Sequence, residues 1–147
     1  MTTKFPSAGL CMTLGIVLSV GRADEVPSAI DCQTHFTTEG NFLTGRKYST
    51  WVLLPGTAKA VAYTRVYSSI AKDGWSIVNA DKDAGIISAA QGVSYGRGSQ
   101  APMTIVVEDD EKGSRVSVTF RTGGAQTARE ETVRTKLCSY LVSSMSP

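Results

Sequence analysis

The chain has 147 residues, of which 41% are hydrophobic and 19% are charged, and its formal net charge is +2. This length suits a single globular domain. So small a net charge argues against a nucleic-acid partner, because proteins of that class carry a basic stripe that attracts phosphates.

The N-terminus carries the three-part pattern of a secretory signal peptide. Lys4 supplies a positive charge, residues 9–20 form an apolar run without a charged residue, and Gly21-Arg22-Ala23 places small side chains where a signal peptidase cuts. The apolar run is shorter than the roughly 20 residues that cross a bilayer, so we expect no stable membrane insertion. We therefore predict a signal peptide at residues 1–23 and a periplasmic or secreted domain at 24–147.

Cleavage of this signal would change both the charge and the cysteine count. It removes Lys4 and Arg22 from the 15 basic residues and none of the 13 acidic ones, so the mature domain has no formal net charge. It also removes Cys11 and leaves Cys32 and Cys138. An even number of cysteines in an exported chain favours a disulfide, which for so long a loop stabilises by about 4.7 kcal/mol. The alternative is a pair of buried free thiols.

The first half of the mature chain predicts a strand and a helix, with a candidate short strand before them. The candidate lies in a polar arm at residues 24–47, which leads to a strand that stops at a Pro-Gly pair. Thr57 is the expected N-cap of the helix. Val66 and Ile70 lie four residues apart, which is helical spacing, and Gly74 favours a left-handed C-cap. The predicted ranges are 48–54 for the strand and 57–72 for the helix, and the candidate short strand is 36–42.

The second half predicts a meander of four strands and a last helix. Residues 115–121 alternate apolar and polar side chains, so one face of this strand is buried and the other faces water. Residues 126–145 carry apolar and charged side chains on opposite sides of an amphipathic helix. The remaining predicted strands are 75–80, 85–90 and 103–107. We therefore predict an α+β fold in which an antiparallel sheet of four to five strands is packed on one side by two helices, in the order β-α-β-β-β-β-α.

Part of this pattern resembles a family of bacterial envelope proteins. The residues that carry the resemblance are Gly74-Trp75 at the end of the helix, Ile77 and Val78 in the next strand, Asp81 and Gly85-Ile86-Ile87 around a hairpin, and residues 116–120 in the last strand. They make the chain similar to small periplasmic helix-grip domains such as those of the outer-membrane assembly lipoprotein BamC. The resemblance implies a non-enzymatic domain with an exposed sheet or groove for a partner. The chain departs from that family because no lipid-attachment cysteine follows its signal and it has one such domain instead of two.

The sequence presents no catalytic constellation. His35 is the only histidine, which excludes a multi-histidine zinc site and leaves a serine or cysteine nucleophile without an oriented base. Its simplest interpretation is a partly exposed polar residue. No Cys-x-x-Cys pair is present. A carboxylate pair for glycoside cleavage stays open, because its spatial separation cannot be seen in a sequence. We predict no catalytic residue, and hence no enzyme.

Two acidic segments and one glycine-rich segment are candidates for metal or cofactor sites. The run 108–111 and the pattern Asp81-x-Asp83-x-Gly85 fit hairpin turns better than calcium loops, which need oxygens at several spaced positions. The glycines of residues 92–100 lack the ending of a phosphate loop. We predict no metal and no cofactor.

The same glycine-rich segment carries Tyr95 and Arg97, two residue types that are frequent where proteins meet partners. We take them as a tentative partner-binding loop, beside the ordinary alternative of a flexible connection.

These observations favour a non-enzymatic binding module of the bacterial envelope whose partner is another envelope or secreted protein. One alternative is a periplasmic inhibitor or immunity protein, for which a small preorganised domain is suited. The other is a small-ligand carrier with a pocket between helix and sheet, lined by Tyr63, Val66, Trp75 or Tyr140.

Overall fold

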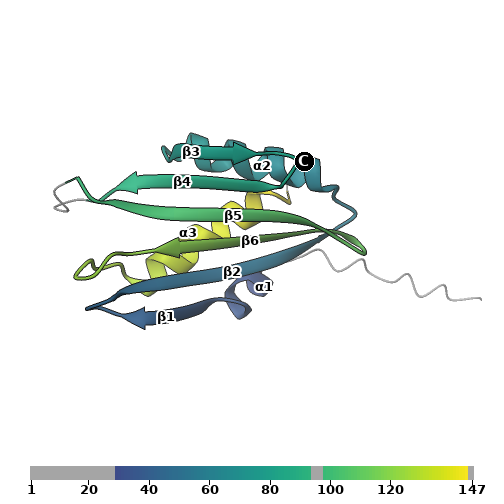
Figure 1. Cartoon of the computed structure of the whole chain (residues 1–147). Helices are drawn as coiled ribbons and strands as arrows, with labels where there is room; N and C mark the ends of the chain where they lie inside the picture. Colours follow the sequence, from purple (N-terminus) through teal and green to yellow (C-terminus); the bar gives the residue numbers. More distant parts are fainter. Residues whose placement is uncertain (1–28, 94–97, 146–147) are drawn as a thin grey trace, which may run out of the picture.

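The computed structural model describes residues 29–93 and 98–145. These residues form an open antiparallel sheet of six strands in the order β1-β2-β6-β5-β4-β3, and three helices lie on one of its faces (Figure 1). In chain order the elements are α1 (Ala29–Thr34), β1 (Thr37–Asn41), β2 (Gly45–Pro55), α2 (Lys59–Lys72), β3 (Ser76–Asp81), β4 (Ile86–Gly92), β5 (Gln100–Asp110), β6 (Gly113–Arg121) and α3 (Glu130–Ser143). Among these described residues, no helix has the length and apolar character needed to cross a bilayer.

The predicted α+β class is confirmed, but the predicted count of four to five strands and two helices is too low. α1 has only six residues, so apolar periodicity cannot reveal it. β1 falls within the candidate short strand at residues 36–42, which the predicted strand order left out, and it is exposed at all five positions without alternation. A tight connection pairs it with β2, because the Asn41 side chain accepts two backbone hydrogen bonds and Gly45 adopts a φ of +97°. The described part of the predicted polar arm therefore forms α1, β1 and the start of β2.

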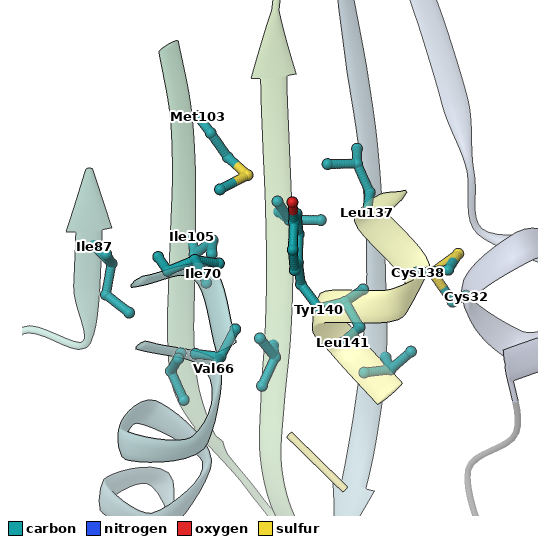
Figure 2. Close-up of a cluster of buried hydrophobic side chains, with 14 of the residues drawn as sticks. Cys32, Val66, Ile70, Ile87, Met103, Ile105, Leu137, Cys138, Tyr140 and Leu141 are labelled. Carbon is teal, nitrogen blue, oxygen red and sulfur yellow. A yellow bond between two sulfur atoms is a disulfide. The ribbon is translucent and has the colours of Figure 1, made fainter. Parts of the chain in front are cut away.

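The sheet has one buried face and one open face. In β2 the residues that point toward the helices are buried, and the residues between them lie on the open face. β6 alternates in the same way, which confirms the prediction for residues 115–121. Figure 2 labels the side chains that meet in the core: Val66 and Ile70 of α2, Leu137, Tyr140 and Leu141 of α3, and Ile87, Met103 and Ile105 of the strands. Their removal from water, at about 25 cal/mol per Å² of apolar surface, holds the helices on this face.

The two edges of the sheet differ. β1 pairs regularly with β2, and Glu39 on β1 forms an ion pair with Lys47 on β2, with a nitrogen–oxygen distance of 2.8 Å. β3 pairs with β4 through a register shift between Ile77 and Asn79, and Val78 between them is 68% exposed. Such a bulge bends the outer strand and makes it a poorer template for another strand.

The end of α2 is built as a Schellman motif. Gly74 has a φ of +85°, its N–H donates to the carbonyl of Ala71, and the N–H of Trp75 donates to the carbonyl of Ile70. The helix therefore stops sharply, with Asp73 and Trp75 in fixed positions on either side of the glycine. The start of the helix differs from the prediction, because Ala58 and not Thr57 is the N-cap residue, and no side chain caps the first turn.

A disulfide joins Cys32 of α1 to Cys138 of α3, which confirms the predicted bridge. Both cysteines are buried in the core (Figure 2). The Thr50 hydroxyl on β2 donates a hydrogen bond to the Cys32 carbonyl over 2.5 Å. The short helix α1 is thus held against both α3 and the sheet.

Replacing both cysteines in Cys32→Ala/Cys138→Ala should lower the free energy of unfolding by about 2 to 5 kcal/mol, because the bridge closes a loop with a sequence separation of 106 residues. Urea titration followed by circular dichroism measures the difference. The unchanged protein treated with reductant is the control and should lose a similar amount. A loss below about 1 kcal/mol in both cases would contradict a stabilising role for the bridge.

Candidate functional site

A cleft of about 300 Å³ lies between α3 and the buried face of the sheet. Its walls come from elements far apart in the chain: the end of α2, the start of β3, the ends of β4 and β6, and α3. Its apolar lining residues are Trp75, Phe120, Ala128, Val133 and Leu137, and its polar lining residues are Asp73, Gln91, Thr132, Lys136 and Tyr140. A concave apolar site with a few converging polar groups is the usual form of a small-molecule site.

Aromatic rings fix the shape of the cleft. The Trp75 ring stands edge-on to Phe120, with centroids 6.0 Å apart and an interplanar angle of 87°, and edge-on to Tyr140, with centroids 6.5 Å apart. Phe120 in turn stacks on Tyr48 from β2. Edge-to-face contacts are a favoured geometry for aromatic rings, so these walls are set by packing within the protein itself.

A chain of hydrogen bonds crosses the cleft from its aromatic wall to its rim. The Trp75 Nε1–H donates to the Tyr140 hydroxyl over 2.8 Å, and that hydroxyl donates to the Asp73 carboxylate. The Lys136 Nζ donates to both carboxylate oxygens of Asp73, at 3.0 and 3.2 Å. Lys136 and Tyr140 are four residues apart on α3 and therefore face the same side. The Schellman motif at the end of α2 supplies the other two partners.

This chain shifts the pKa of two of its members. The hydrogen bond from Tyr140, followed by that from Lys136, lowers the pKa of Asp73. Burial, reinforced by the hydrogen bond to Asp73, raises the pKa of Tyr140 to about 12. At neutral pH the phenol therefore keeps its proton and Asp73 stays a carboxylate. General acid–base catalysis works best with a pKa near the operating pH, and the shift of Tyr140 moves it further from that range.

The structure brings only part of the predicted pocket together. Trp75 and Tyr140 line the cleft as expected, whereas Tyr63 and Val66 are buried in the core and are not among its lining residues. Tyr95 and Arg97 of the tentative partner-binding loop lie outside the described residues.

Sequence reasoning missed Asp73 and Lys136 as members of a site. In the sequence Asp73 only precedes the helix-ending Gly74, and Lys136 is one of several charged residues in the range 126–145. The four-residue spacing of Lys136 and Tyr140 was the available signal, but it does not identify the partner, which is 63 residues from Lys136 in the chain.

The acidic segments are hairpin turns, as predicted. The Asp81 carboxylate accepts a hydrogen bond from the Ala84 N–H, and the Asp110 carboxylate accepts one from the Lys112 N–H. Over residues 29–93 and 98–145, the structure contains no cluster of three or more acidic, histidine or cysteine side chains that could hold a metal ion.

A second feature lies on the open face of the sheet. The His35 ring stacks on the Trp51 ring, with centroids 3.6 Å apart and an interplanar angle of 10°, and the Arg115 guanidinium carbon lies 4.2 Å from the centre of the same indole. Both groups approach the ring too closely to share one side, so they cover opposite faces of Trp51. His35 is thus partly exposed, as the sequence predicted, and one face of its ring lies against Trp51.

Comparison of the sequence with known protein families and with curated proteins finds no match. The likeness to BamC-type helix-grip domains therefore remains a resemblance that rests on the hairpin residues quoted above.

Tyr140→Phe should remove a loss of stability that we expect in the unchanged protein at alkaline pH. The fold favours the neutral phenol of Tyr140. The stabilisation that this gives the folded protein is complete below the ordinary tyrosine pKa of 10 and is lost as the pH rises toward about 12. A rise of the pKa from 10 to about 12 corresponds to about 2 to 3 kcal/mol in the free energy of unfolding. Urea unfolding at stepped pH values measures it.

Tyr63→Phe is the matched control, since burial also raises the pKa of Tyr63 but that residue lies outside the cleft. This variant should keep the part of the alkaline loss that comes from Tyr140. The free energy of unfolding can then be plotted against pH for Tyr140→Phe and for the unchanged protein. If the two curves run parallel above the ordinary tyrosine pKa, the alkaline loss of stability does not come from Tyr140.

Proposed function

We propose that the mature chain is an exported, non-enzymatic binding module of the bacterial envelope, and that it holds a small, largely apolar molecule in the cleft beneath α3. The observation that carries this proposal is the cleft itself: aromatic and aliphatic walls enclose about 300 Å³, and polar groups converge on its rim. This volume lies at the lower end of the range typical of small-molecule sites.

The state of the polar groups favours binding over chemistry. The Tyr140 hydroxyl both accepts and donates a hydrogen bond, and both oxygens of Asp73 accept from Lys136. The raised pKa of Tyr140 and the lowered pKa of Asp73 both lie away from neutral pH, whereas a general acid or base works best with a pKa near the operating pH. These polar groups hold the walls of the cleft in place instead.

Export is the part of the proposal that rests on the sequence. The leader pattern at residues 1–23 and the disulfide between Cys32 and Cys138 both suit an oxidising compartment outside the cytosol. A disulfide-closed domain with a preformed cleft loses little freedom when a ligand enters, which favours binding.

Native mass spectrometry of the protein purified from its own host tests the carrier function. We expect a second mass, above that of the mature chain, which disappears on denaturation. In the variant Ala128→Phe a phenyl ring would occupy part of the cleft, and the extra mass should be lost.

Ala60→Phe is the control variant, because Ala60 is an exposed residue on α2 outside the cleft. It should retain the extra mass. If the spectra of the unchanged protein and of this control both show only the mass of the mature chain, with no bound ligand, the carrier function is contradicted.

The open face of the sheet supports a second candidate, an envelope or secreted protein as partner. The helices leave this face uncovered (Figure 1), and it carries the stacked Trp51 together with Leu53 and Ile86, which are 39% and 37% exposed. Tryptophan and arginine are enriched among the residues that dominate protein interfaces, and Arg115 lies directly on Trp51.

Leu53→Lys/Ile86→Lys should abolish recovery of such a partner from an envelope extract, because it places two charges on the open face. Val61→Lys is the control, since Val61 is 43% exposed on α2 and so lies on the helix side. Affinity capture followed by mass spectrometry compares the variants. If both variants capture every protein from the extract in equal amounts, the open face is not the binding surface for a partner.

A further inference from the structure

We infer that the cleft takes an uncharged molecule of two-ring size that carries one hydrogen-bonding group. This inference names the ligand class for the proposed carrier function and rests on it. Three features of the cleft define this ligand class. The volume of the cleft sets the size of the ligand, the charges at its mouth set the ligand's charge, and its free polar groups set the ligand's hydrogen-bonding group.

The volume sets the size of the ligand. An apolar cavity of about 150 Å³ is sufficient to bind one benzene ring. The cleft has about 300 Å³, which suits two fused rings. Trp75 and Phe120, whose rings meet edge to face, supply aromatic surface to the walls of the cleft.

The charges at the mouth cancel. Lys136 and Asp73 line the cleft and form an ion pair with a nitrogen–oxygen distance of 3.0 Å. The remaining lining residues are uncharged. A ligand that carries a charge would lose its hydration in an apolar site and find no opposite charge free to compensate it. The cleft therefore discriminates against both anions and cations.

The free polar groups at the mouth specify the hydrogen-bonding group. Gln91 and Thr132 are exposed lining residues, and within the described residues neither side chain makes a hydrogen bond. The amide and the hydroxyl can each donate and accept, so a hydroxyl or carbonyl on the ligand can bind here while its rings lie deeper. By contrast, the Tyr140 hydroxyl is already occupied on both sides.

Three probes with the same two-ring body test this inference: neutral naphthol, anionic naphthoate and cationic naphthylmethylammonium. Isothermal titration calorimetry with the mature, disulfide-bonded protein gives their affinities. We expect naphthol to bind about tenfold more tightly than either charged probe, because the charged probes must be desolvated without compensation.

The two tryptophans locate the bound probe. Trp75 lines the cleft, and Trp51 lies on the opposite face of the sheet, so a proton–nitrogen correlation spectrum should show one indole signal from each. Naphthol should shift the Trp75 signal, whose N–H donates to Tyr140, and leave the Trp51 signal in place. Trp51→Phe identifies which signal is which.

Lys136→Met tests the charge argument without filling the cleft. Lys136 has a side chain that is 56% exposed, so the variant should fold. It leaves the Asp73 carboxylate without its counter-charge, and the affinity for naphthylmethylammonium relative to naphthol should rise about fivefold or more. Ala128→Phe should lose naphthol binding, whereas Ala60→Phe should keep it.

The outcomes separate the two proposals. Preference for naphthol, with a Trp75 shift and the expected response to Lys136→Met, supports the inference. Binding of a charged probe in the cleft as tightly as naphthol overturns the ligand class and leaves the carrier function standing. If none of the three probes shifts the Trp75 indole signal, although the protein unfolds cooperatively and is therefore folded, the inference is overturned. This result also counts against the carrier function.

Discussion

The Tyr140 side chain is the point on which the packing of the helices and the shape of the cleft both depend. Its ring is buried in the core against Trp75, and its hydroxyl accepts from that indole and donates to Asp73. A buried hydroxyl without hydrogen-bond partners costs free energy. The favoured position of α3 is therefore the one that brings the Tyr140 hydroxyl within hydrogen-bonding distance of both Trp75 and Asp73. That requirement fixes α3 relative to the end of α2, and with it the position of α3 over the cleft.

The strongly periodic elements could be predicted from the sequence, whereas the short strand β1 was marked only by the turns around it and α1 was not found. The apolar spacing of α2 and the alternation of β6 reflect burial on one side, which the chain must encode in its side chains. α1 has six residues and is held by a disulfide and a hydrogen bond from Thr50, while β1 is held by its turn with β2. Such constraints act across space and leave no periodic signal.

The same distinction applies to the cleft. Trp75 and Tyr140, two of the residues named for a pocket between helix and sheet, line the cleft. Tyr63 was expected beside them, but its position on α2 directs it into the core. The ion pair of Asp73 with Lys136 joins residues 63 apart in the chain, and only the crossing of α3 over the Schellman motif brings them together. Charge pairing of this kind follows from the fold.

The unequal edges of the sheet determine how copies of this protein can meet. The bulge at Val78 distorts the ladder of hydrogen-bonding groups along β3, whereas β1 presents a regular, solvent-exposed ladder. Two copies that joined along β1 would form a continuous twelve-stranded sheet, and each would then offer only its bulged rim to a third copy. Strand addition along β1 would therefore end at a pair, because the bulged β3 is a poorer template for a further strand.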